Sequence, residues 1–98
     1  MTRDEVLSRA MSAVSGDRDH NYGGPEDSFL AISAMWNIYL TKTTGAKVVL
    51  GPSDVAAMMA LLKIVRIAAS PDHEDSWVDL AGYAACGGEI SCVGSGDQ

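Results

Sequence analysis

Pro71–Ile90, PDHEDSWVDLAGYAACGGEI, is the stretch that decides the fold, because it has the pattern of the last helix of the chain. We expect Asp72 at its N-cap, and Asp75 three residues later would complete a capping box. Asp72, Asp75 and Asp79 are spaced by three and four residues, which places them on one stripe of a helix. The apolar face expected to enter the core consists of Trp77, Leu80, Ala81 and Ala84.

Three carboxylates on one stripe repel one another unless positive charge neutralises them. The sequence offers two alternatives, which are a divalent cation or basic side chains of a neighbouring helix. Lys63 and Arg66 lie three residues apart late in the preceding helix, and in an antiparallel hairpin they could reach Asp75 or Asp79. Asp79 is the informative acid, since capping and the helix dipole do not explain a carboxylate two turns into a helix.

Three further helices are expected before this one. Thr2 and Glu5 have the spacing of a capping box and open a helix over about residues 3–15. Pro25 begins a second helix, which runs to about residue 41, and Pro52 begins a third. The sequence Ser70-Pro71 ends the third helix.

The segment 41–51 is the least regular part of the pattern. Gly45 marks a turn, and residues 47–50 form either a short extended piece or a lead-in to the next helix, without a sheet. Gly87 and Gly88 are costly inside a helix and are candidates to end the last helix early, whereas Gly82 indicates a close helix approach or room for a ligand. The sequence therefore predicts one all-α domain over residues 1–98, a helical hairpin or bundle of about four helices with a frayed tail at 93–98.

The composition favours self-association. Hydrophobic residues make up 47% of the chain and charged residues only 20%, which is an apolar balance for a domain of 98 residues. The third predicted helix is apolar over more than half of its circumference, with a buried stripe expected at Val55, Met58, Met59, Leu62, Val65 and Ala69. We therefore expect a homo-oligomer that buries the apolar faces of the second and third helices.

The charge balance and the apolar pattern exclude several classes of protein. A net charge of −6 argues against a general nucleic-acid binder, although a local basic site for a small anion is compatible with it. No apolar run resembles a signal peptide or a membrane span, so a cytoplasmic protein is expected. Cys86 and Cys92 are expected to be reduced thiols, since no zinc-binding spacing surrounds them.

Two groups of side chains are candidates for a functional site, one acidic and suited to a metal ion and one suited to binding an anionic ligand. Mg²⁺ prefers oxygen ligands, and the candidate metal ligands are Asp75 and Asp79, the same two acids that we expect to be catalytic, together with two acids of the second helix, Glu26 and Asp27. Capping and dipole effects are the alternative explanation for all of these acids except Asp79. The candidate ligand-binding residues are Lys63 and Arg66, which suit a phosphate, and two residues of the loop at 17–24, His20 and Tyr22.

The chain also resembles an uncharacterised family of small bacteriophage and prophage proteins. The resemblance covers residues 20–90 and is most specific in the run DSWVDLAGYA, residues 75–84. It implies a phage origin, and hence the host-cell cytoplasm as the place of action, and it assigns no activity.

A second likeness is to the all-α nucleotide pyrophosphohydrolases of the MazG and dimeric dUTPase type, through Asp79-Leu80-Ala81-Gly82-Tyr83. It implies Mg²⁺ bound by acids of two helices and cleavage of nucleoside triphosphates to monophosphates. Carried over, Asp75 and Asp79 would be metal ligands, with Glu26 or Asp27, and Lys63 with Arg66 would hold phosphate. The Glu-x-x-Glu of that family is absent, because Phe29 and Leu30 follow the two acids at that distance.

These observations lead to one hypothesis and two rivals. The first is a phage nucleotide-handling protein, either a Mg²⁺-dependent pyrophosphohydrolase or a binder of nucleotide phosphate. The second is a non-catalytic protein that sequesters a signalling nucleotide or a host protein. The third is a structural helical oligomer in which acids and bases pair with one another.

Overall fold

The structure is a computed structural model, and it describes residues 1–15 and 24–92. This part of the chain contains four helices, α1 (Arg3–Val14), α3 (Pro25–Thr44), α4 (Pro52–Ala69) and α5 (Glu74–Cys92). No strand occurs among the described residues, and the predicted all-α fold is confirmed. The loop residues His20 and Tyr22 lie outside the described ranges.

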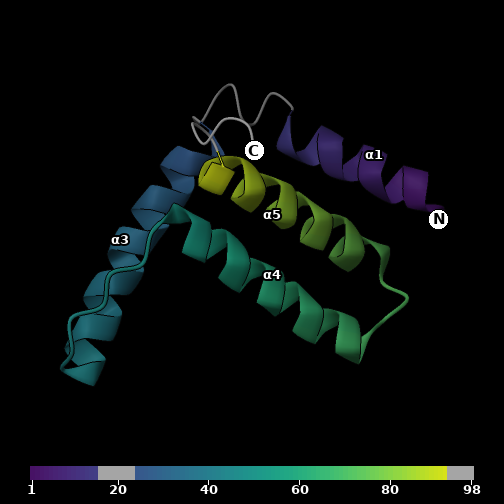
Figure 1. The fold of residues 1–98 in the computed structure, drawn as a ribbon. Coiled ribbons are helices and arrows are strands. Elements are labelled where there is room, and N and C mark those ends of the chain that lie inside the picture. Colours follow the sequence, from purple (N-terminus) through teal and green to yellow (C-terminus); the bar gives the residue numbers. More distant parts are fainter. Residues whose placement is uncertain (16–23, 93–98) are drawn as a thin grey trace.

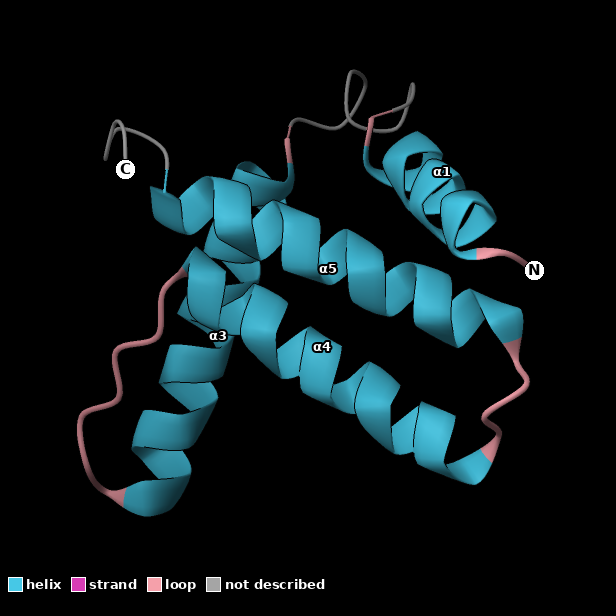
Figure 2. Ribbon diagram, turned by 45° about the vertical axis from the view of Figure 1, so that its right-hand side comes forward, coloured by secondary structure: helices cyan, strands magenta, loops and turns pink. Residues whose placement is uncertain are grey.

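Helix α5 is the centre of the arrangement (Figure 1). It forms an antiparallel hairpin with α4, and α1 packs along its other side, parallel to it. Helix α3 packs mainly on α4 and extends away from the hairpin at an angle, as Figure 2 also shows. None of the described helices is long and apolar enough to cross a membrane.

The predicted helix starts are largely confirmed. The Glu5 amide donates to Thr2 Oγ1 over 3.2 Å and the Thr2 amide donates to Glu5 Oε1 over 2.6 Å, which is the reciprocal pattern of a capping box. Pro25 and Pro52 each occupy the first turn of a helix. At the start of α4 the amide of Gly51 donates to Asp54 Oδ2 over 2.8 Å, so a carboxylate also satisfies a backbone donor there.

Helix α3 is three residues longer than predicted and ends at Gly45, whose φ of 74° lies in the left-handed region that glycine adopts without strain. The chain then runs back along α3 as an extended piece, one of the two conformations that the sequence left open. Asn37 holds it, because its side chain accepts from the Leu50 amide (2.7 Å) and donates to the Leu50 carbonyl (3.0 Å). Thr41 Oγ1 accepts from the Val48 amide over 3.1 Å. These side chains supply the hydrogen bonds that a neighbouring strand would otherwise provide.

The prediction that Asp72 caps the last helix is wrong. Helix α5 begins at Glu74, and Asp72 lies in the turn before it. The His73 amide donates to the Ser70 carbonyl over 3.1 Å, and Trp77 Nε1 donates to the Pro71 carbonyl over 2.8 Å. These bonds close a tight turn around residues 70–73, so the residue directly before the helix is His73 and not Asp72.

The prediction that Gly87 and Gly88 end the last helix is also wrong, since α5 continues to Cys92. A Cβ atom on Gly87 would lie 3.0 Å from Ala56 Cβ, and one on Gly82 would lie 3.3 Å from Val14 Cγ1. Gly82 therefore marks a close approach of α1, and Gly87 a close approach of α4. The glycines cost helix propensity but allow α5 to pack tightly on both sides.

The buried core of the described chain is small. Its hydrophobic members are Ala10, Val55, Ala56, Val78 and Cys86. The predicted core face of α5 is wrong at two of its four positions, because Trp77 is 43% exposed and Ala84 is exposed, whereas Leu80 and Ala81 are half-buried. The buried positions of α5 are Ser76, Val78, Gly82 and Cys86. The face is rotated because contacts at small residues bring the flanking helices closer to α5 than a large side chain allows.

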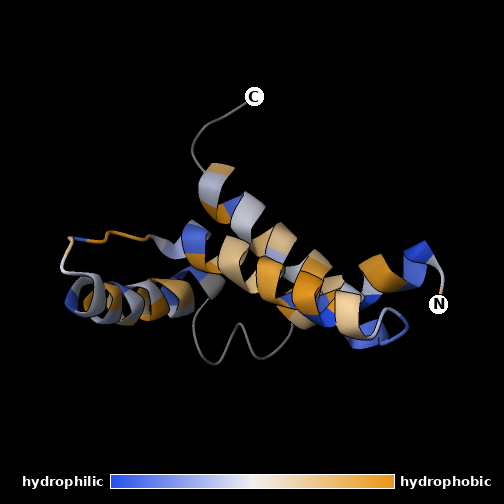
Figure 3. Cartoon of the chain, turned by 90° about the horizontal axis from the view of Figure 1, so that it is seen from below, coloured by the Kyte–Doolittle hydropathy of each residue, from blue (hydrophilic) through white to orange (hydrophobic). Residues whose placement is uncertain are grey.

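The predicted buried stripe of α4 is confirmed only at Val55, which is fully buried. Met58, Leu62 and Val65 of the same stripe are 39%, 43% and 67% exposed. Large apolar side chains are exposed on α3 as well, and Figure 3 shows hydrophobic residues along the length of this helix. The apolar surface that the sequence predicted to be buried is therefore largely uncovered in the single chain.

Candidate functional site

The acids of α5 are neutralised by bases from two different helices. Arg9 of α1 binds Glu74 Oε1 over 3.3 Å and Asp75 Oδ1 over 2.5 Å. Lys63 of α4 binds Asp79 Oδ2 over 3.0 Å. The pairing of Lys63 with Asp79 is one that the sequence allowed, and it answers the question of what offsets the repulsion along the stripe.

The two ion-pair clusters differ in burial. The side chain of Lys63 is 16% exposed and that of Asp79 is 42% exposed, whereas Arg9, Glu74 and Asp75 are 46%, 56% and 63% exposed. Water screens charges at the exposed cluster more strongly. The Lys63–Asp79 pair therefore has the stronger electrostatic interaction of the two.

Arg66 lies one turn beyond Lys63 at the C-terminal end of α4. It is exposed, and within residues 1–15 and 24–92 no carboxylate pairs with it. The guanidinium group presents planar N–H donors that match a phosphate or a carboxylate. Lys63 pairs with Asp79 at the edge of the α4–α5 hairpin, and together with Arg66, one turn further along α4, we call these residues the polar cluster.

The structure does not bring the acids of α3 to this cluster. Glu26 and Asp27 lie in the first turn of α3, beside the C-terminal end of α5, while Asp75 and Asp79 belong to its N-terminal half (Figures 1 and 2). The described residues include no group of three or more His, Cys, Asp or Glu side chains placed to hold a metal ion. Asp75 and Asp79 are thus the two candidate ligands that remain close, one turn apart on α5.

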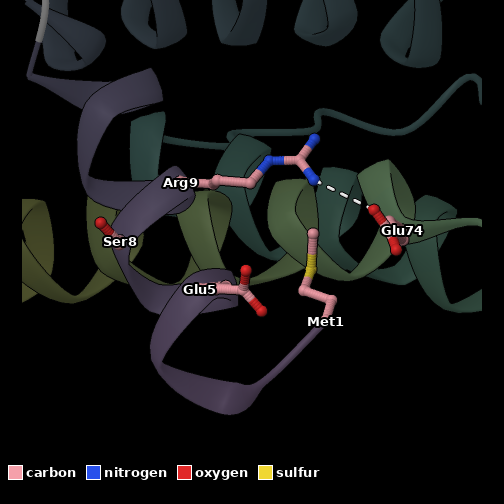
Figure 4. Close-up of a pocket in the computed structure, with 5 residues that line it drawn as sticks. All are labelled: Met1, Glu5, Ser8, Arg9 and Glu74. Carbon is pink, nitrogen blue, oxygen red and sulfur yellow. Dashed lines mark hydrogen bonds and ion pairs between the residues drawn. The ribbon is translucent and has the colours of Figure 1, made fainter.

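A pocket of about 340 Å³ lies beside the Arg9 cluster, between the start of α1 and the start of α5. Figure 4 shows Arg9 reaching Glu74 across it, and the other lining residues are Met1, Glu5 and Ser8. The Thr2 backbone amide, which donates to the Glu5 carboxylate, holds the pKa of Glu5 below its ordinary value. This carboxylate is therefore charged where it faces the pocket.

Arg9 is the site residue that sequence reasoning missed. The available signal was its place directly before Ala10, a small apolar residue that is buried at 6% exposure. A base at the border of a packed helix face is positioned to reach the next helix. Which helix it meets depends on the packing of α1 on α5, and that is not written in local spacing.

Comparison with known proteins places the chain in a family. A family model described as a domain of unknown function, DUF6378, matches residues 5–91. The chain belongs to the DUF6378 family.

Proteins of two bacteriophages are similar to this DUF6378 protein. The Gene 55 protein of Mycobacterium phage D29 is 36% identical over 83 residues, which cover 85% of this chain and 51% of the relative. The Gene 55 protein of Mycobacterium phage L5 is 37% identical over 79 residues, covering 81% of this chain and 47% of the relative. The chain thus spans about half the length of these relatives, and the predicted resemblance to an uncharacterised phage family is confirmed. No solved structure matches the chain.

Proposed function

We propose that this phage-family protein binds the phosphate groups of a nucleotide through Lys63 and Arg66, in the cytoplasm of the host cell. The observation that carries the proposal is the pairing of Lys63 with the half-exposed Asp79, next to a guanidinium that no described carboxylate neutralises. An anion entering here meets two cations one helical turn apart.

The Lys63–Asp79 pair can exchange its partner. An ammonium group has three N–H donors, and a single carboxylate oxygen at 3.0 Å uses one of them. A di- or triphosphate carries more negative charge than one carboxylate, so it competes well for Lys63. Arg66 would add planar, bidentate contacts to the same phosphate group.

Binding without hydrolysis is the function that this geometry favours. Glu74, Asp75 and Asp79 are each paired with a base, so no metal ion is needed to offset their charge. A protein of this kind would sequester a nucleotide, such as a signalling nucleotide of the host, as the non-catalytic hypothesis predicted. Sequestration of a host protein remains the other form of that hypothesis.

Mg²⁺-dependent pyrophosphate release is the second candidate function, and the position of Asp75 and Asp79 one turn apart supports it. Mg²⁺ is usually held by one or two carboxylates together with substrate phosphates and water, so this pair would suffice as protein ligands. A bound Mg²⁺ would polarise the phosphate for attack by water. Under this function Arg9 and Lys63 release the two carboxylates and bind phosphate instead.

The likeness to MazG-type enzymes supports this second function only in part. In the run that carries it, Gly82 is buried against Val14 and Tyr83 packs against Phe29, with ring centroids 6.1 Å apart. Packing of the helices is therefore a sufficient reason for these two residues. Asp79 is the member of the run that a catalytic function would require.

A thermal-shift panel tests the proposal, with nucleoside triphosphates, monophosphates and cyclic dinucleotides, each with and without Mg²⁺. A ligand that binds only the folded chain raises the melting temperature by mass action. We expect a shift without metal, and we expect Asp79→Asn to keep it. A shift that requires Mg²⁺ with a triphosphate, together with pyrophosphate release that Asp79→Asn abolishes, supports the enzyme instead. No shift with any compound contradicts nucleotide binding.

We also propose that the protein acts as a homo-oligomer. The small core and the many exposed apolar side chains of α3 and α4 support this proposal, because soluble monomers seldom leave such surface uncovered.

A further inference from the structure

The outer face of α4, the side turned away from α5, is a continuous apolar surface. We define it by its large side chains, Met58, Leu61, Leu62, Ile64 and Val65, which are between 39% and 67% exposed. Small exposed alanines continue it at both ends, at positions 57, 68 and 69. The inner face of the same helix holds the buried Val55 and Ala56 and the lysine that pairs with Asp79.

The spacing on this outer face is that of a helix–helix contact. Met58, Leu61, Val65 and Ala68 recur at intervals of three, four and three residues, as the contact positions of paired helices do. No charged residue occurs at any of these positions. Of the two cations of α4, Lys63 points to α5, and Arg66 lies one turn after Leu62, at the border between the outer and the inner face.

The amount of apolar surface matches what a dimer buries. Five large apolar side chains at about half exposure, with the alanines beside them, present roughly 600 Å², at the upper end of the largest patch on a typical monomer. A standard interface buries about 800 Å² on each partner, of which slightly more than half is apolar. The outer face of α4 can therefore form the centre of such an interface.

A second copy of this chain is the partner that suits this face best. Each copy has a net charge of −6, so two copies approach most easily along a surface that lacks acids. Helix α4 contains one acid, Asp54, and it lies in the first turn. Two antiparallel copies of the helix also align their dipoles favourably.

We propose that the protein forms a two-fold symmetric dimer in which the outer faces of α4 from two copies pack antiparallel. With the two-fold axis at the level of residue 63, Leu61 of one copy lies against Val65 of the other and Met58 lies against Ala68, and each contact occurs twice. This inference rests on the self-association proposed above and is independent of nucleotide binding. Because Lys63 points to the opposite side of α4, it stays accessible in the dimer.

Sedimentation equilibrium over a wide range of protein concentrations tests the interface. The wild-type chain should have about twice its monomer mass of 10.3 kDa, and Leu61→Glu should have the monomer mass. Leu7→Glu is a matched control, because Leu7 of α1 is 61% exposed and Leu61 is 62% exposed. The control should remain dimeric.

Two results overturn the inference, and they differ in what they reject. A monomeric wild-type chain rejects self-association itself. A wild-type oligomer that survives Leu61→Glu, or that Leu7→Glu disrupts equally, rejects this surface while leaving self-association in place. Val65→Glu is a second variant, and circular dichroism must show that each variant keeps the wild-type helix content.

Discussion

The two sides of α5 are held by the same two kinds of contact, a glycine packed against a small apolar group and an ion pair, but they differ in how tightly these contacts pack. On the α1 side, Gly82 faces Val14 and the acids pair with Arg9; on the α4 side, Gly87 faces Ala56 and Asp79 pairs with Lys63. The α4 side is tighter, with a closer approach at its glycine and a less exposed ion pair. Helix α5 therefore packs more tightly on α4 than on α1. Substitutions on the α4 side should have the larger effects on the free energy of unfolding.

The largest effect is expected from Gly87→Ala. The added Cβ would lie 3.0 Å from Ala56 Cβ, which is buried and attached directly to the backbone, so α4 and α5 must move apart. We expect a loss of about 1–3 kcal/mol in the free energy of unfolding, measured by urea denaturation. An unchanged or raised stability would show that the hairpin is less tightly packed than described.

A smaller effect is expected from neutralising the bases. Lys63→Met should destabilise the fold by about 1–2 kcal/mol, because Asp79 is left without its partner at a half-covered position. Arg9→Met should lower the free energy of unfolding by about 0.5 kcal/mol, since the carboxylates of its partners Glu74 and Asp75 are well solvated. Equal losses for the two variants in urea denaturation would contradict the difference between the two sides.

Gly88→Ala and Gly82→Ala are variants at glycines of α5 where, unlike at Gly87, an added methyl group should not destabilise the fold. Apart from its chain neighbours and the backbone of α5, no atom of the described residues lies within 4 Å of a Cβ on Gly88, so alanine there should stabilise α5 by about 0.5–1 kcal/mol. On Gly82 the new Cβ would meet Val14 Cγ1 at 3.3 Å, and that side chain can turn away, so the net change should be close to zero. The order Gly88, Gly82, Gly87 in melting temperature is the expected result, and any other order is inconsistent with the described packing.

The smallest effect concerns the capping box at the start of α1. Since the folded pKa of Glu5 lies below its ordinary value of 4.5, its stabilising effect is present above that value and is lost as the pH falls through the lowered pKa. An NMR titration should show Glu5 titrating below 4.5, with the Thr2 amide shifting at the same pH. Thr2→Pro removes the donating N–H and should return the pKa toward its ordinary value; a titration unaffected by this variant would contradict the cause.

Capping residues, prolines and glycine predicted the ends of several helices from the sequence. The Thr2–Glu5 capping box, the prolines at 25 and 52 and the left-handed Gly45 each act within a few residues, so their effects can be read from the sequence. The sequence failed where the outcome depends on tertiary packing. Helices α4 and α5 are apolar on more than one side, so periodicity alone did not reveal which face of each meets its neighbour.

The candidate site was predicted in part for the same reason. The sequence allowed an ion pair between a base of one helix, Lys63 or Arg66, and Asp75 or Asp79 of the next, and the structure contains the pair of Lys63 with Asp79. Arg9 was not predicted, because its partners lie 65 and 66 residues away on a helix that no local pattern connects to α1.

Titration calorimetry with a nucleoside triphosphate, on the wild type, Lys63→Met and Arg9→Met, measures directly whether Lys63 binds phosphate. We expect the wild type to bind without added metal. We expect Lys63→Met to weaken binding by at least about tenfold. This fold-change corresponds to about 1.4 kcal/mol of binding free energy, roughly the contribution of one charge-assisted hydrogen bond. Arg9→Met should bind nearly as the wild type does. Binding that Arg9→Met weakens and Lys63→Met leaves intact, or no binding by the wild type, would contradict phosphate binding by Lys63.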